Sequence, residues 1–177
     1  MIDVLKERKK KGNKVLFRPN DEIFSPLNLL LEKASHRAVV LWALDLAEED
    51  VKVLSQKYPC DNRAKNAFNA AELWSRGQIK MREAQRAILD CHAAAKEISS
   101  ASDIALYHAV GQACSTVHTA GHAMGFPVYD LTAAVVENFE NCLEIAIQKT
   151  QRYIEKLHYV LNNPQLQNRE WACFLNG

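Results

Sequence analysis

Apolar residues recur every three or four positions along most of the chain, which is the period of an amphipathic helix. The pattern predicts six helices, at residues 25–33, 35–57, 62–76, 80–98, 103–124 and 129–161. No segment shows the alternating, β-branched pattern of a strand. We therefore expect an all-α fold, a single-domain bundle of five or six mostly antiparallel helices with a long C-terminal helix.

Residues that start or stop helices lie at the ends of these segments. Ser35 and Asp61 are suited to cap the N-termini of the helices that follow them. Gly77 stands where the helix over 62–76 needs a residue in the left-handed conformation. Pro127 and Pro164 follow the predicted ends of two further helices. The connections are short, which favours antiparallel neighbours.

The N-terminal segment differs in charge from the rest of the chain. Residues 1–18 hold seven basic side chains against Asp3 and Glu7, although the 177-residue chain has a formal net charge of only +1. No aromatic residue interleaves with the lysines to stack on bases, so nucleic-acid binding is not expected. We expect residues 1–24 to form a solvated basic arm and residues 25–177 to form one helical domain.

Composition and cysteine usage indicate the cellular compartment of the protein. The longest apolar run, Ala38 to Leu44, is far shorter than the roughly 20 residues of a membrane-spanning helix. The basic N-terminus lacks the apolar core of a secretory signal. The five cysteines are odd in number and form no C-x-x-C pair. These features predict a cytoplasmic protein with free thiols and no membrane contact.

Histidines gather on the segment predicted as a helix over 103–124. They share one side with small residues, in a stripe made of Ile104, His108, Gly111, Ser115, His118, His122 and Gly125. On a helix, His118 and His122 would stand at positions i and i+4, a spacing that allows two imidazoles to bind one metal ion. The pair is therefore a candidate metal site, although such pairs are also common on helices without metal. The sequence specifies no particular cofactor.

A second set of polar residues lies on other predicted helices. His36, Asp45, Asp61, Arg63 and His92 are candidate ligand-binding residues. The alternative is structural, since Asp45, Arg63 and His92 could satisfy one another as a buried polar network that fixes helix register. No serine or cysteine has a recognisable nucleophile setting and no glycine-rich phosphate loop occurs. Whether the protein is an enzyme is therefore left open.

Ordered motifs over residues 35–129 resemble a known family. They are His36-Arg-Ala-Val-Val-Leu-Trp42-Ala-Leu-Asp45, Asp61-Asn-Arg63, Trp74-Ser-Arg-Gly77, His92-Ala-Ala-Ala95, and His118-Thr-Ala-Gly-His122-Ala-Met-Gly125. Together they are similar to the α-helical "putative immunity protein" family of bacterial polymorphic toxin systems. Ala64 departs from the family, which often has proline there. Residues 1–34 and the segment after Pro127 lie outside the similarity.

The resemblance implies a small helical protein that binds and neutralises a partner toxin. The alternative is a metal-binding or small-ligand-binding helical protein, possibly enzymatic, in which His108, His118 and His122 face His92, His36 and Asp45 across a groove. A third interpretation is a homodimer formed through the long C-terminal helix. This helix has more apolar positions than a single buried face needs.

Overall fold

The computed structural model describes residues 1–175, and within them every regular element is a helix. This part of the chain forms eight α-helices and five short 3-10 helices. The α-helices are α1 (Ile2–Lys10), α2 (Ser25–Leu31), α3 (His36–Lys57), α4 (Arg63–Ser75), α5 (Met81–Ala94), α6 (Ala101–Ser115), α7 (Gly125–Glu137) and α8 (Cys142–Asn162). The all-α prediction is confirmed, whereas the predicted number of five or six helices is too low.

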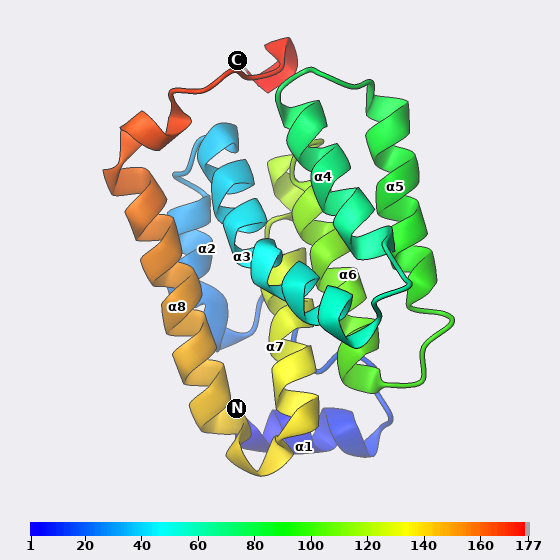
Figure 1. The fold of residues 1–177 in the computed structure, drawn as a ribbon. Helices are drawn as coiled ribbons and strands as arrows, with labels where there is room; N and C mark the ends of the chain where they lie inside the picture. Colours follow the sequence, from blue (N-terminus) through cyan, green and yellow to red (C-terminus); the bar gives the residue numbers. More distant parts are fainter. Residues whose placement is uncertain (176–177) are drawn as a thin grey trace.

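From α3 to α8, successive helices run in alternating directions, so the bundle is antiparallel (Figure 1). Two residues predicted to start or stop helices, Ser35 and Gly77, do so in the structure. The Ser35 side chain accepts a hydrogen bond from the Ala38 backbone N–H at the start of α3. Gly77, with φ of +73°, follows α4, and its backbone N–H bonds to the Trp74 carbonyl. Asp61, by contrast, lies one residue before the cap of α4, which is Asn62.

Two predicted helices are in fact interrupted. The segment predicted as one helix over 103–124 ends at Ser115, then continues through a turn and a 3-10 helix, η2 (Ala120–His122). The segment predicted over 129–161 is divided into α7 and α8 by a break around Asn138. The long C-terminal helix therefore spans Cys142–Asn162, and α7 is a separate helix that packs against α6.

The central helix α3 contributes to two hydrophobic clusters. Trp42 faces the cluster shared with α2, α7 and α8, and its indole N–H donates to the Tyr153 carbonyl at 2.9 Å. Val40 and Leu44 face the other cluster, which α3 shares with α4, α5 and α6. Alanines at the helix contacts, including Ala67, allow close approach of the backbones while the large rings fill the space between.

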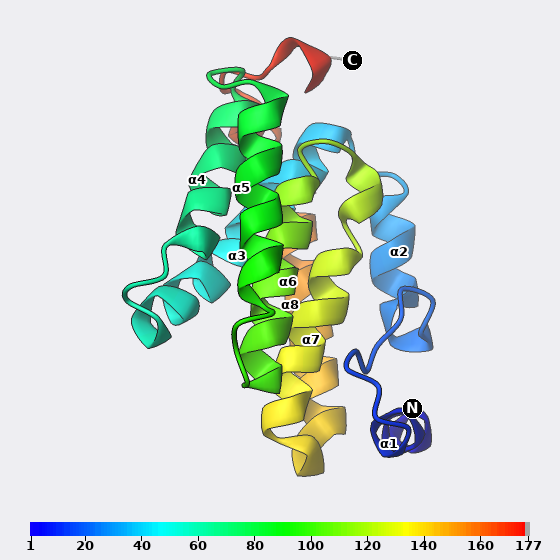
Figure 2. The same cartoon turned by 90° about the vertical axis from the view of Figure 1, so that its right-hand side faces the viewer.

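The N-terminal segment is only partly the solvated arm expected from its charge. Leu5, Leu16 and Phe17 are each no more than 2% exposed and belong to the cluster around Trp42. α1 lies across one end of the bundle, seen end-on in Figure 2. Most of its lysines face solvent. The apolar residues on either side of the lysines therefore anchor this segment, and charge alone did not show them.

Candidate functional site

A groove of about 400 Å³ opens beside α5, between α4, the end of α6 and the η2 turn. Its lining combines apolar and uncharged polar side chains, namely Trp74, Met81, Gln85, Ile88, Leu89, His92, Gln112, Ser115, His118 and His122. Three of the six histidines in the chain therefore line one surface pocket. A concave, largely apolar site with a few convergent polar groups is the usual form of a binding site.

His92 and His108 form a hydrogen-bonded pair between α5 and α6. Their Nδ1 atoms are 2.9 Å apart, and their ring centroids are 5.2 Å apart. Such a bond requires that one Nδ1 carries a proton and the other does not. Burial lowers the pKa of both rings, and for His92 the neighbouring His108 and His122 lower it further, to about 4. Both rings are therefore neutral at pH 7.

The glycines of the histidine stripe make room for groove side chains. A β-carbon at Gly111 would come within 2.4 Å of the His92 ring, and one at Gly125 would come equally close to the Gln112 amide oxygen. That oxygen accepts a hydrogen bond from His122 Nδ1 at 3.1 Å. The small residues thus allow the His92 and Gln112 side chains to take up space beside α6 and α7.

His118 and His122 do not stand on a common α-helix. His118 is in the turn after α6, where it is exposed and its ring stacks on Trp74 at 6.1 Å between centroids. His122 closes η2. The helical i and i+4 geometry behind the metal prediction is therefore wrong, although both side chains line the same groove. Within residues 1–175, no three His, Cys, Asp or Glu side chains are already arranged to hold a metal ion.

His36 and Asp45 lie outside the groove and have other partners. His36 Nε2 is 2.7 Å from the Thr116 carbonyl oxygen, so this ring links the start of α3 to the end of α6. Asp45 is exposed on α3 and pairs with Lys156 of α8 at 2.5 Å. The predicted groove between the histidine stripe and these two residues is therefore not formed.

Asp61 and Arg63 form a separate network at the start of α4. The Arg63 guanidinium binds both Asp61 and Glu97 at 2.8 Å, and the Tyr107 hydroxyl donates to Asp61 at 3.1 Å. The Arg63 side chain holds the pKa of both carboxyl groups below their usual range. The predicted network of Asp45, Arg63 and His92 is wrong, because each of these residues has different partners.

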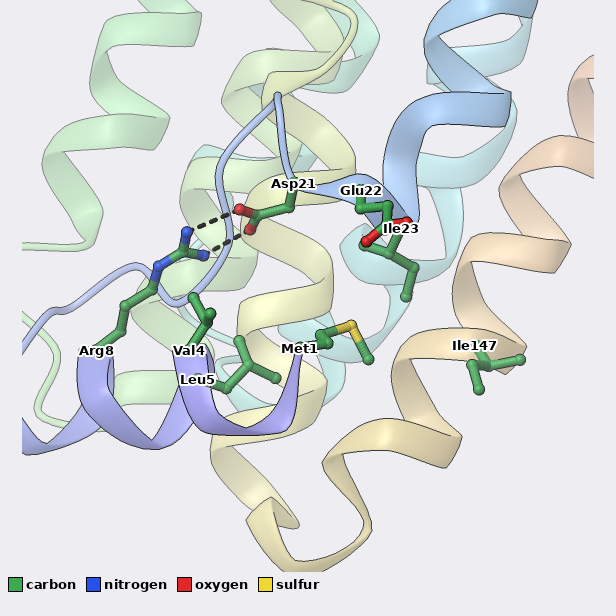
Figure 3. Close-up of a pocket in the computed structure, with 8 residues that line it drawn as sticks. All are labelled: Met1, Val4, Leu5, Arg8, Asp21, Glu22, Ile23 and Ile147. Atoms are coloured by element: carbon green, nitrogen blue, oxygen red, sulfur yellow. Dashed lines mark hydrogen bonds and ion pairs between the residues drawn. The ribbon is translucent and has the colours of Figure 1, made fainter.

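Another pocket, of about 340 Å³, lies where α1 meets η1 (Glu22–Phe24) and α8 (Figure 3). Met1, Val4 and Ile147 are its exposed apolar side chains. The Arg8 guanidinium makes two hydrogen bonds to the Asp21 carboxylate, at 2.6 and 2.7 Å. These charges satisfy each other, so this pocket offers a ligand mainly apolar contact.

Sequence reasoning missed the partners that complete the histidine groove. Trp74 supplies an aromatic wall from α4, and Gln112 orients His122. Trp74 is distant in sequence from His118, so the pattern of one helix does not predict this contact. Gln112 lies on α6 and meets His122 because the helix is interrupted after Ser115, which the apolar pattern alone does not reveal.

The fold and the groove define a small all-α protein with a surface groove between α4, α5 and the end of α6. The family described as "Imm-5 like putative immunity protein" has a sequence model that matches residues 29–156. The chain belongs to this family. The match includes α7 and most of α8, so the similarity extends well beyond residues 35–129. The comparisons with curated proteins and with solved structures gave no match.

Proposed function

We propose that this protein binds and neutralises a partner toxin by forming a complex with it. The observation that carries the proposal is the family match, which covers the helices that build the groove. Neutralisation by complex formation needs a stable scaffold and a complementary surface, and it needs no catalytic residue. In the described residues, no helix is both long and apolar enough to span a membrane.

The rim of the histidine groove supports a docking role for this surface. Leu89, Phe174 and Met81 are 60%, 52% and 46% exposed, and Phe174 packs on Trp74 at 5.6 Å between ring centroids. Exposed apolar side chains around a concave pocket are typical of protein interaction sites. The groove lining contains no Lys, Arg, Asp or Glu side chain, which favours an apolar segment of the toxin as its contact.

Co-expression with a candidate toxin, chosen among the proteins encoded beside this one, tests the proposal. We expect the tagged protein to capture this toxin and to restore growth of cells that express it. Leu89→Lys should abolish capture, because it places a charge at the rim of the groove. Leu29→Lys is the matched control, since Leu29 is similarly exposed, at 58%, but lies on α2. Failure of the wild-type protein to bind the toxin would contradict the proposal.

A homodimer is the other interaction to test. Leu143, Ile147 and Tyr159 are exposed on α8, and these positions motivate the interpretation that two copies associate through this helix. Sedimentation velocity over a range of concentrations distinguishes the two states. A protein that stays monomeric at high concentration would exclude the dimer interpretation. Capture of the toxin by that monomer would support complex formation between unlike chains.

A further inference from the structure

His92 and His122 each use one ring nitrogen to bind the protein and leave the other one without a partner. Nδ1 of His92 bonds to His108, and Nδ1 of His122 bonds to Gln112. No hydrogen bond within residues 1–175 involves Nε2 of either ring, and neither Nε2 is among the fully buried polar atoms that lack a partner. Neither Nε2 atom is therefore completely buried, and both rings line the groove.

The hydrogen bond at Nδ1 determines which nitrogen carries the lone pair. A carboxamide oxygen can only accept, so His122 donates through Nδ1–H to Gln112 and its Nε2 bears a lone pair. His92 has the same form when its Nδ1–H donates to Nδ1 of His108. Histidines that bind metal ions are typically held in this way, with the second ring nitrogen donating to a neighbouring acceptor.

The composition of the groove selects the class of ion. Its lining contains no carboxylate and no thiol. Mg²⁺ and Ca²⁺ require oxygen ligands, mainly carboxylates, whereas neutral imidazole suits Zn²⁺, Cu²⁺ and Ni²⁺.

We propose that the groove binds a divalent late first-row transition ion, with Zn²⁺ as the probe, through Nε2 of His92 and His122. His118 provides a third imidazole. It is exposed in the turn after α6, where its ring stacks on Trp74. Solvent completes the coordination. This site differs from the predicted helical pair because His92 of α5 supplies a principal ligand.

Calorimetric titration of the tag-free full chain with ZnCl₂ at pH 7.5 tests the proposal, with MgCl₂ as the control ion. We expect one Zn²⁺ per chain, a rise in Tm on binding and no binding of Mg²⁺. His92→Gln and His122→Gln should each weaken Zn²⁺ binding by at least about tenfold. His158→Gln removes an exposed histidine of α8 outside the groove and should leave the affinity unchanged.

Circular dichroism of each variant separates loss of the site from loss of the fold. If His92→Gln fails to fold, His122→Gln still tests the site, since His122 lies in a short surface turn. Absence of Zn²⁺ binding by the wild-type chain would overturn the proposal, and so would equal weakening by His158→Gln. The test uses no toxin, so its outcome is independent of toxin neutralisation.

Discussion

The imidazole ring of His92 occupies the space that a side chain at Gly111 would need. A β-carbon built at Gly111 would lie 2.4 Å from Cε1 and 2.5 Å from Nε2 of His92. Both residues lie within packed helices, α5 and α6, so neither can move away freely. The absence of a side chain at Gly111 is therefore a condition for the His92–His108 pair.

Gly111→Ala should destabilise the protein by about 1–3 kcal/mol, because overpacking displaces His92. Alanine is favoured over glycine within a helix by roughly 1 kcal/mol, so a destabilised variant shows that the steric conflict is larger than this gain. Urea denaturation measures the change. Gly121→Ala is the control, since its nearest neighbour is the Thr119 hydroxyl at 3.5 Å. If Gly111→Ala were as stable as the wild type or more stable, the close packing of the His92 ring against Gly111 would be contradicted.

Stability should fall as the pH decreases from about 6.5 to about 4. The pKa of His92 is lowered to about 4 in the folded protein, whereas a histidine in an unfolded chain titrates near 6.5. Between these values the unfolded chain binds more protons, so the free energy of unfolding rises with pH. His92→Gln should flatten this part of the profile, whereas His158→Gln should not. Chemical denaturation at several pH values measures how the free energy of unfolding changes with pH. The same dependence in the wild type and in His92→Gln would contradict the lowered pKa of His92.

Asp50 should respond to pH in the opposite sense. Its side chain, on α3, is buried, and within residues 1–175 its Oδ2 atom has no hydrogen-bond partner. Burial and the neighbouring charge of Asp130 raise its pKa well above the usual value. The folded state therefore retains a proton that the unfolded chain releases, and stability is lost as the pH rises through the folded pKa.

Asp50→Asn, which carries no charge at any pH, should therefore be more stable than the wild type at pH 8, by about 1 kcal/mol or more. The difference should shrink towards pH 4, and thermal unfolding at both pH values measures it. Asp45→Asn is a control for the loss of a carboxylate, because Asp45 forms an exposed ion pair worth at most about 1 kcal/mol. A destabilised Asp50→Asn at pH 8 would show that the ionised carboxylate is favourable.

The sequence predicted the all-α class and the three helices over 35–57, 62–76 and 80–98 well, since apolar period and end signals coincide there. It missed the break after Ser115 because the apolar stripe continues across it. Side-chain hydroxyls bind the backbone at this point, with Thr116 donating to the Ala113 carbonyl and Thr119 accepting from the Gly121 N–H. Such local bonds compete with the helix without changing the hydrophobic pattern.

For the candidate site, too, the sequence predicted the positions of some residues and not of others. The sequence grouped His92 with His118 and His122, and the structure places all three around one groove. His36 and Asp45 were also expected at this groove, but the apolar stripe of one helix does not specify which neighbour a polar group meets. Asp45 instead pairs with Lys156, 111 residues further along the chain. Contacts between helices so distant in sequence are set by packing, which the pattern of one helix does not show.

Phe17 provides the test of the N-terminal segment. It is 2% exposed and meets Phe24 edge to face, with ring centroids 6.0 Å apart. If residues 1–24 were only a solvated arm, Phe17→Ala would leave stability unchanged. Because this ring lies in the cluster that contains Trp42, we expect a loss of about 3–5 kcal/mol, measured by urea denaturation. Lys10→Ala, an exposed change in the same segment, should alter stability by less than about 0.5 kcal/mol. A similarly small effect of Phe17→Ala would mean that the N-terminal segment contributes little to the folded state.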